Sequence, residues 1–222
     1  MLSAFEIHLW IESLEYSSTN LLALESLLSP DERKRAVRFY FDIHRARFIA
    51  ARGRLRQILA TYLSSDPAAL VFSYNAHGKP FLDGQELRFN LSHSGTKAVY
   101  AIAQGRELGV DIERIQPEFA KERIPEMFFS PGEAAALRSL PSDAQTEAFF
   151  RCWTRKEAYV KARAEGLSMA LDSFDVSLGP DEPARFLRNG EGWSIYSFRV
   201  EPDYLGAIVA EGTGWTVQTI LR

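Results

Sequence analysis

The sequence predicts an α+β fold made of two similar lobes related by pseudo-twofold symmetry. Strand-like and helical patterns are grouped along the chain instead of strictly alternating, and one helix-start motif occurs twice. Ser29-Pro30-Asp31-Glu32 is followed 101 positions later by Ser130-Pro131-Gly132-Glu133. In each copy Ser suits the N-cap, Pro the first helical position and Glu the third. Chance recurrence is the alternative. We place the boundary after Gln104, which gives lobes of residues 1–104 and 105–222.

The first lobe is expected to contain one strand, three helices and then further strands. Residues 5–12 alternate apolar and polar side chains, as a half-buried strand does. Helical spacing of apolar residues follows, and then short strand-like runs separated by turn signals. The expected helices are 21–28, 30–39 and 43–63, and the expected strands are 71–75, 87–93 and 97–103.

The second lobe is expected to repeat this order. Its first strand, residues 108–113, alternates apolar and acidic side chains. The expected helices are 118–127, 131–140 and 143–164, and the later strands are 174–178, 193–198, 205–210 and 215–220.

Two acidic residues share one face of the strand at 108–113. Positions two apart on a strand point the same way, so Asp111 and Glu113 project together while Val110 and Ile112 point into the core. Adjacent carboxylates repel each other unless a cation or proton intervenes, and hard oxygen ligands suit Mg²⁺. A solvated strand face is the ordinary alternative for an isolated pair of this kind.

A second candidate cluster lies on the expected helix 143–164. Trp153, Glu157 and Lys161 recur every four residues, which places them on one helical face. Glu157 and Lys161 alone could be a surface ion pair, but Trp153 on the same stripe suggests that this face is partly buried.

A third cluster, Asn90-Leu91-Ser92-His93, ends the expected strand 87–93. Ser92 and His93 are chain neighbours and point apart on a strand, so they cannot act as nucleophile and base together. Small polar groups of this kind could bind phosphate oxygens, although a lone His is more often structural.

The charge is unevenly distributed. The formal net charge is −3, yet residues 31–56 hold nine basic and three acidic residues, a local charge of +6. The balance excludes a surface that coats nucleic acid, whereas basic helices could hold a small polyanion. A single cysteine, Cys152, and the absence of a signal peptide or an apolar run of about 20 residues predict a soluble cytoplasmic protein with no membrane partner.

Four motifs occur together in one order and spacing. They are Gly78-Lys79-Pro80, Asn90-Leu91-Ser92-His93-Ser94, Gly109-Val110-Asp111-Ile112-Glu113 and the stretch from Trp153 to Lys161. Across roughly residues 27–174 the chain resembles a 4′-phosphopantetheinyl transferase of the Sfp-like type, with both lobes in one chain. The resemblance implies transfer of the phosphopantetheine arm of coenzyme A to a serine of an acyl or peptidyl carrier protein, with release of 3′,5′-ADP. It also implies coenzyme A bound between the lobes, and we expect a monomer.

The resemblance also implies roles for individual residues. Asp111, Glu113 and Glu157 would hold Mg²⁺, with Glu157 a candidate base for the carrier serine. Lys161 would contact the diphosphate, and a metal beside this cation would neutralise most of the charge in the transition state.

The remaining implied contacts are with the nucleotide. His93, a further catalytic candidate, would meet phosphate oxygens together with Ser92 and Asn90. The other expected coenzyme A ligands are Gly78, Lys79 and Pro80 along the adenine, and Arg35, Arg45 and Arg52 around the 3′-phosphate, with Arg47 a substitute for Arg45.

Two other functions fit parts of the pattern. A non-catalytic module that binds carrier proteins or coenzyme A would keep the fold without transfer. A metal-dependent phosphodiesterase would use the acidic pair for hydrolysis.

Overall fold

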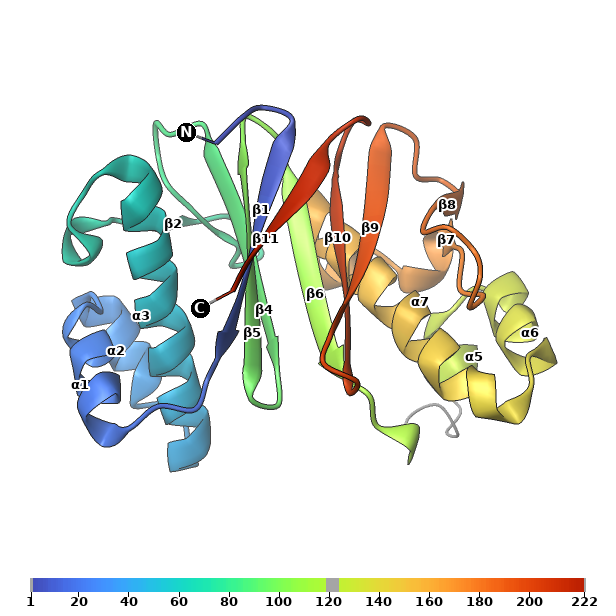
Figure 1. The fold of residues 1–222 in the computed structure, drawn as a ribbon, viewed down its shortest axis with the longest axis horizontal. Helices are drawn as coiled ribbons and strands as arrows, with labels where there is room; N and C mark the ends of the chain where they lie inside the picture. The colour runs from blue at the N-terminus through green and yellow to red at the C-terminus, as the bar shows by residue number, and fades with distance from the viewer. Residues whose placement is uncertain (1, 119–123, 222) are drawn as a thin grey trace.

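Two β-sheets stack against each other between two groups of helices in the computed structural model, which describes residues 2–118 and 124–221. The first sheet has the strand order β11-β1-β5-β4 and the second the order β6-β10-β9. Helices α1 to α3 cover the outer face of the first sheet, and α7 packs on the second (Figure 1). The prediction of an α+β fold is confirmed.

The elements follow the expected order closely. The helices are α1 (Ser18–Ser26), α2 (Pro30–Ala36), α3 (Asp42–Leu63), α5 (Ile124–Phe128), α6 (Pro131–Ser139) and α7 (Ser142–Arg163). The sheet strands are β1 (Glu6–Ser13), β4 (Leu87–Ser94), β5 (Lys97–Gln104), β6 (Leu108–Arg114), β9 (Trp193–Val200), β10 (Tyr204–Glu211) and β11 (Thr216–Leu221). Two short ribbons, β2 (Ser73–Tyr74) with β3 (Pro80–Phe81) and β7 (Asp175–Val176) with β8 (Phe186–Arg188), complete the set. Part of the helix expected at 118–127 lies outside the described residues.

The last strand crosses from one half of the chain to the other. β11 pairs in parallel with β1, with Glu6 opposite Thr216, whereas β1 and β5 are antiparallel neighbours. The end of the second half therefore completes the sheet of the first half. The lobe boundary expected after Gln104 stays a prediction, and the chain turns from β5 to β6 there, at Gly105 with a φ of +61°.

The repeated motif has the same local structure in both halves. α2 and α6 each begin with a capping box and a proline in the first turn. The long helices that follow, α3 and α7, each contain 22 residues and each end at a residue in the left-handed conformation, Ser64 and Ala164. These parallels support the prediction that the two lobes are related by pseudo-twofold symmetry.

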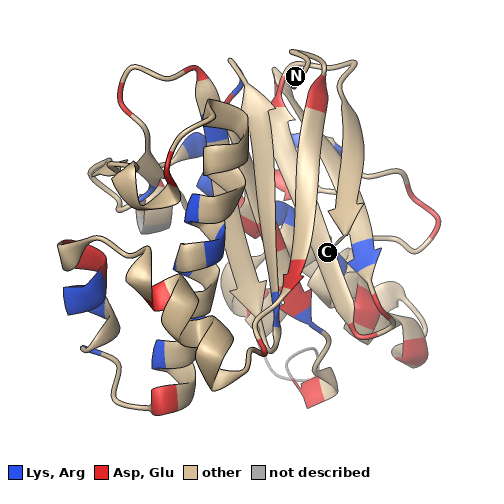
Figure 2. Ribbon diagram, turned by 60° about the vertical axis from the view of Figure 1, so that its left-hand side comes forward, with Lys and Arg blue, Asp and Glu red and all other residues tan. Residues whose placement is uncertain are grey.

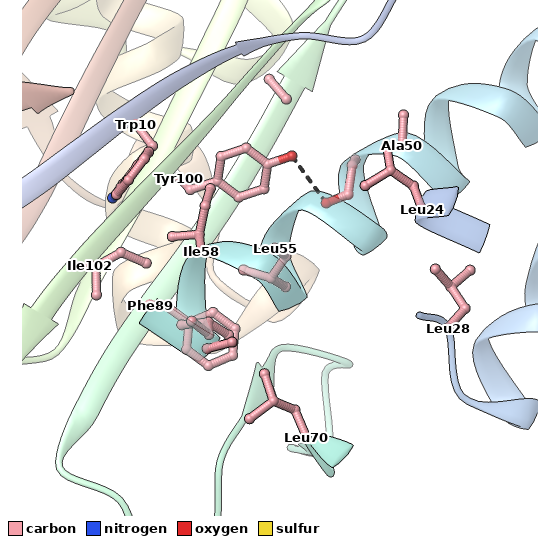
Figure 3. Close-up of a cluster of buried hydrophobic side chains, with 14 of the residues drawn as sticks. Trp10, Leu24, Leu28, Ala50, Leu55, Ile58, Leu70, Phe89, Tyr100 and Ile102 are labelled. Carbon is pink, nitrogen blue, oxygen red and sulfur yellow. Dashed lines mark hydrogen bonds between the residues drawn. The ribbon is translucent and has the colours of Figure 1, made fainter. Parts of the chain in front are cut away.

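The core has three apolar clusters that correspond to the three interfaces between layers. One lies between α1, α3 and the first sheet, where the Tyr100 hydroxyl donates to the Ala51 carbonyl of α3 at 3.0 Å (Figure 3). A second, including Val99 and Ile208, lies between the sheets, and a third packs α7 on the second sheet. Hydrophobic burial thus fixes α7 against β10 of the second sheet, and β6 against the first sheet.

Candidate active site

The candidate site forms where the end strands of the two sheets lie side by side. β4 ends the first sheet and β6 ends the second. A side chain joins them, because the Asn90 amide oxygen accepts from the Val110 backbone N–H at 2.9 Å. On the other side of β6, α7 comes so close that a Cβ on Gly109 would lie 2.2 Å from the Ala158 carbonyl oxygen. Only glycine permits this approach of helix and strand.

Asp111 is the centre of a buried polar cluster. Its Oδ1 lies 2.6 Å from Lys161 Nζ and accepts a hydrogen bond of 2.8 Å from Ser92 Oγ. Lys161 also donates to Ser92 Oγ at 3.0 Å, so the three groups form a closed triangle. Asp111 is only 2% exposed, and its other oxygen, Oδ2, is buried with no hydrogen-bond partner in the described structure. A buried carboxylate oxygen in this state has the capacity to bind a cation.

Two further carboxylates lie within electrostatic range of Asp111. Burial and then the charge of Asp111 raise the pKa of Glu113 to about 7. Burial and the charge of Asp111 also raise the pKa of Glu157, while Lys161 opposes the shift. Nevertheless, the described residues contain no group of three or more His, Cys, Asp or Glu arranged to hold a metal ion. The three predicted ligands are therefore close enough to interact but do not converge on one point.

His93 lies at the rim of this cluster. Part of its ring is exposed. Partial desolvation, and then the positive charge of Lys161, lower the pKa of His93. The Arg47 charge acts in the same direction, which places Arg47 near this part of the site. A neutral imidazole can both donate and accept hydrogen bonds.

A cleft of about 540 Å³ opens beside the cluster. Its lining includes Gly78, Lys79 and Pro80 together with Asn90, Glu157 and Lys161. The cleft thus brings together residues from both halves of the chain.

Lys79 lines the cleft but directs its charge elsewhere. Its ammonium donates to the Leu108 carbonyl at 2.9 Å and lies 3.5 Å from Glu107, and burial lowers the pKa of Lys79. Asn75 similarly donates to the Ala164 carbonyl at 3.0 Å. Side chains therefore tie the turn of the β2–β3 ribbon both to the start of β6 and to the C-terminal end of α7.

The three predicted arginines do not meet at one place. Arg35 lines a separate cavity of about 580 Å³ together with Lys34 and Arg38. Arg45 lies outside that cavity, 3.8 Å from Asp42. These residues belong to the basic α2–α3 region, whose charges are visible in Figure 2.

Arg52 has a structural environment. It is 7% exposed, and its guanidinium lies 2.5 Å from Glu32 Oε1 and donates to the Tyr74 hydroxyl. Tyr74 itself lines the cavity beside Arg35, so Arg52 lies behind that cavity wall.

Similar proteins agree on one family. Residues 14–105 match the model "4′-phosphopantetheinyl transferase, N-terminal", and residues 107–209 match "4′-phosphopantetheinyl transferase superfamily". The chain is 40% identical over 214 residues to 4′-phosphopantetheinyl transferase HetI of Nostoc sp., covering 95% of this chain and 90% of that protein. The chain belongs to the 4′-phosphopantetheinyl transferase family. It is 31% identical over 188 residues to 4′-phosphopantetheinyl transferase Sfp of Bacillus subtilis, covering 83% of each protein, and like these relatives it is an enzyme.

The cleft of this phosphopantetheinyl transferase also contains residues that were not assigned from the sequence. They include His77, Met127, Phe128, Val160, Ala164, Gly166 and the segment 169–172. The segment lies shortly after α7, and it is part of the GLSMALDSF stretch that belongs to the family resemblance. Met127 and Phe128 lie at and just after the end of the expected helix 118–127, where no motif points to the cleft.

No described helix of the transferase is both long enough and apolar enough to cross a membrane.

Proposed function

We propose that this transferase moves the 4′-phosphopantetheine arm of coenzyme A to a serine hydroxyl of an apo acyl or peptidyl carrier protein and releases 3′,5′-ADP. The observation that carries the proposal is the pairing of Lys161 with the buried Asp111 beside a cleft of about 540 Å³. The second oxygen of Asp111 has no hydrogen-bond partner among the described residues. In the proposed step the serine oxygen bonds to the β-phosphorus, the β-phosphorus–oxygen bond to the nucleotide breaks, and the serine proton passes to a base. Such a step needs charge neutralisation and alignment more than covalent help.

The acidic residues suit Mg²⁺ as the cofactor by their chemistry, and they would move together to hold it, since the described residues show no preformed metal group. Asp111, Glu113 and Glu157 would hold it, because oxygen ligands suit this ion and the unpartnered Asp111 Oδ2 supplies one. Burial, and then the charge of Asp111, raise the pKa of Glu113 and of Glu157, and a bound cation would offset both effects. When bound, Mg²⁺ would neutralise charge on the diphosphate.

Lys161 can bind substrate without releasing Asp111. An ammonium group has three donors, and two of them are used by Asp111 and Ser92. The third can donate to a diphosphate oxygen. Glu157 is a candidate base because its raised pKa lies closer to neutral pH than that of an ordinary glutamate.

The nucleotide contacts are proposed in two regions. His93 would contact the phosphates as a neutral imidazole near Lys161. Ser92 and Asn90, which bond to β6 from the same strand, would contact the phosphates beside it. The proposed adenine contacts are Gly78, Lys79 and Pro80. The proposed 3′-phosphate contacts are Arg35, Arg45 and Arg52, with Arg47, which lies near His93, as a substitute for Arg45.

The direct test combines the protein, coenzyme A, Mg²⁺ and several apo carrier proteins. We expect the carrier serine to gain the mass of the phosphopantetheine arm by mass spectrometry, with release of 3′,5′-ADP. Unmodified carriers, together with Mg²⁺-dependent binding of coenzyme A in calorimetry, would instead support a non-catalytic binding module. Hydrolysis of coenzyme A without carrier modification would support a phosphodiesterase.

Two properties complete the proposal. We expect the enzyme to be a monomer in solution and to act in the cytoplasm. Light scattering on the purified protein tests the first expectation, and fractionation of cells tests the second.

A further inference from the structure

Three alternate residues of β4 point at β6 and bond to it in sequence. The Asn90 amide oxygen accepts from the Val110 N–H at 2.9 Å, and Ser92 Oγ donates to Asp111 Oδ1 at 2.8 Å. Ser94 Oγ donates to Glu113 Oε2 at 2.7 Å. Positions two apart on a strand share a face, so one face of β4 is used at three successive positions.

This row of side chains links two strands that end different sheets. Within each sheet the strands are joined by backbone hydrogen bonds, whereas at this junction polar side chains make the connection. Two of these contacts reach Asp111 and Glu113, the acidic pair of β6.

The Ser94 hydroxyl has a defined direction. It accepts from the Arg114 backbone N–H at 3.0 Å while it donates to Glu113 Oε2. Because the N–H occupies an acceptor site of the hydroxyl, the hydroxyl proton is available for the carboxylate. With Oε2 held in this way, Oε1 is the oxygen that can bind another group.

We propose that Ser94 is a positioning residue that orients the Glu113 carboxylate for a divalent cation, as the outermost member of the row formed by Asn90, Ser92 and Ser94. This inference rests on the proposed function, because the cation is the one that the transfer would use. Outer residues that orient a ligand typically change metal affinity by about 10- to 100-fold when they are removed. The same geometry indicates that Asn90 and Ser92 act at least partly by orienting β6.

The test measures cation binding directly. Mn²⁺, which like Mg²⁺ prefers oxygen ligands, is titrated into the purified protein and free Mn²⁺ is followed by electron paramagnetic resonance. We expect Ser94→Ala to weaken Mn²⁺ binding by about tenfold or more, and Ser94→Thr, which keeps the hydroxyl, to restore it. The affinity for coenzyme A without a divalent cation should stay the same in both variants.

Ser194→Ala is the matched control. Ser194 is also a partly buried strand serine, but its hydroxyl donates to the Gly212 carbonyl at 2.7 Å, away from the acidic pair. Its removal should leave Mn²⁺ binding unchanged. If Ser94→Ala does not fold, Ser94→Cys, which keeps the size but is a weak donor, takes its place.

Unchanged Mn²⁺ binding in Ser94→Ala, or equally weak binding in Ser94→Thr, would overturn the inference. An unmodified chain that binds no Mn²⁺ would overturn it as well. Carrier modification by the unmodified chain is measured separately, so loss of the positioning role and loss of the transferase proposal give different results.

Discussion

Lys161 Nζ and Asp111 Oδ1 lie 2.6 Å apart although 50 positions separate them in the chain. Asp111 is buried on β6 and Lys161 is partly exposed on α7, so the contact joins the wall of the cleft to the second sheet. Close packing at Gly109 makes the contact possible. The ion pair therefore has two roles, one in holding α7 against β6 and one in the proposed transfer.

The first prediction separates these two roles of the ion pair. Lys161→Met leaves Asp111 buried without its counter-ion, and Asp111→Asn leaves the ammonium beside a neutral amide. Both single variants should lose stability, and Lys161→Met should lower kcat by about 10²- to 10³-fold through loss of charge at the phosphates.

The double variant Asp111→Asn/Lys161→Met provides the control. Neither member of the pair is then charged, so urea denaturation should show stability closer to the unmodified chain than in either single variant. Carrier modification should stay at the low level of the single variants. Recovery of activity in the double variant would contradict a direct role in transfer.

The second prediction concerns pH. The pKa of Glu113 is raised to about 7, above its ordinary value of 4.5. Between those values the unfolded chain has lost this proton and the folded chain retains it, so the contribution of Glu113 to stability decreases as pH rises toward 7. Without divalent cations, the melting temperature of the unmodified chain should therefore fall as pH rises toward 7. The Glu113→Gln variant should lack this part of the pH dependence.

A bound cation should shift the same titration. Ionised carboxylates bind cations better, so Mg²⁺ should lower the apparent pKa of Glu113 and transfer should increase with pH up to about neutrality. Raising the Mg²⁺ concentration should move that activity profile to lower pH. If the pH dependence of transfer did not change with the Mg²⁺ concentration, the assignment of Glu113 would be contradicted.

Local patterns predicted the elements that depend on local physics. The helix expected at residues 43–63 was observed as Asp42–Leu63, because a long run of good helix formers without proline predicts a helix even though Phe41 at its start makes no side-chain cap. The shared face of Asp111 and Glu113 followed from strand alternation alone. The β2–β3 and β7–β8 ribbons were shorter than expected or missed, because runs of two or three residues carry no periodicity.

Contacts between distant residues were less accessible to sequence reasoning. Glu32 was interpreted only as a capping residue, yet it also holds Arg52 and Arg56 at 2.5 and 2.7 Å. Its place on a basic helix predicts that an arginine can meet anions, but it does not identify the carboxylate partner of that arginine. For Arg52 that partner is a carboxylate 20 positions away, which no spacing rule identifies.

The third prediction tests the equivalent ion pair of the second half. Lys156 Nζ lies 2.7 Å from Glu133 Oε2, with side chains 0% and 3% exposed, and Lys156 also donates to the Leu171 and Phe174 carbonyls. Lys156→Met keeps the length of the side chain but leaves Glu133 charged and buried. Removing one partner of a buried pair costs about 3–5 kcal/mol, so urea denaturation should show a loss of that order.

Lys97→Met is the matched control for this variant. Lys97 pairs with Glu201 at 2.5 Å, but the Glu201 side chain is 57% exposed. Solvent screening limits such pairs to about 0–1 kcal/mol. If the two Lys→Met variants lost equal stability, the buried ion pair would have no special structural role.

The fourth prediction tests the contact between β6 and α7. A Cβ at position 109 would lie 2.2 Å from the Ala158 carbonyl oxygen and 2.3 Å from the Ala162 nitrogen, so Gly109→Ala must push the helix away from the strand. Overpacking of this kind costs about 1–3 kcal/mol, and the displacement should separate Lys161 from Asp111.

Gly132→Ala is the control. Its Cβ would have Ser130 Oγ at 3.8 Å as its nearest neighbour, and alanine in this helical position should stabilise the protein by about 0.5–1 kcal/mol. We expect Gly109→Ala to lose carrier modification at a temperature where it is still folded by circular dichroism, while Gly132→Ala keeps full activity. Normal transfer by folded Gly109→Ala would show that the site tolerates a wider spacing of β6 and α7 than its hydrogen bonds indicate.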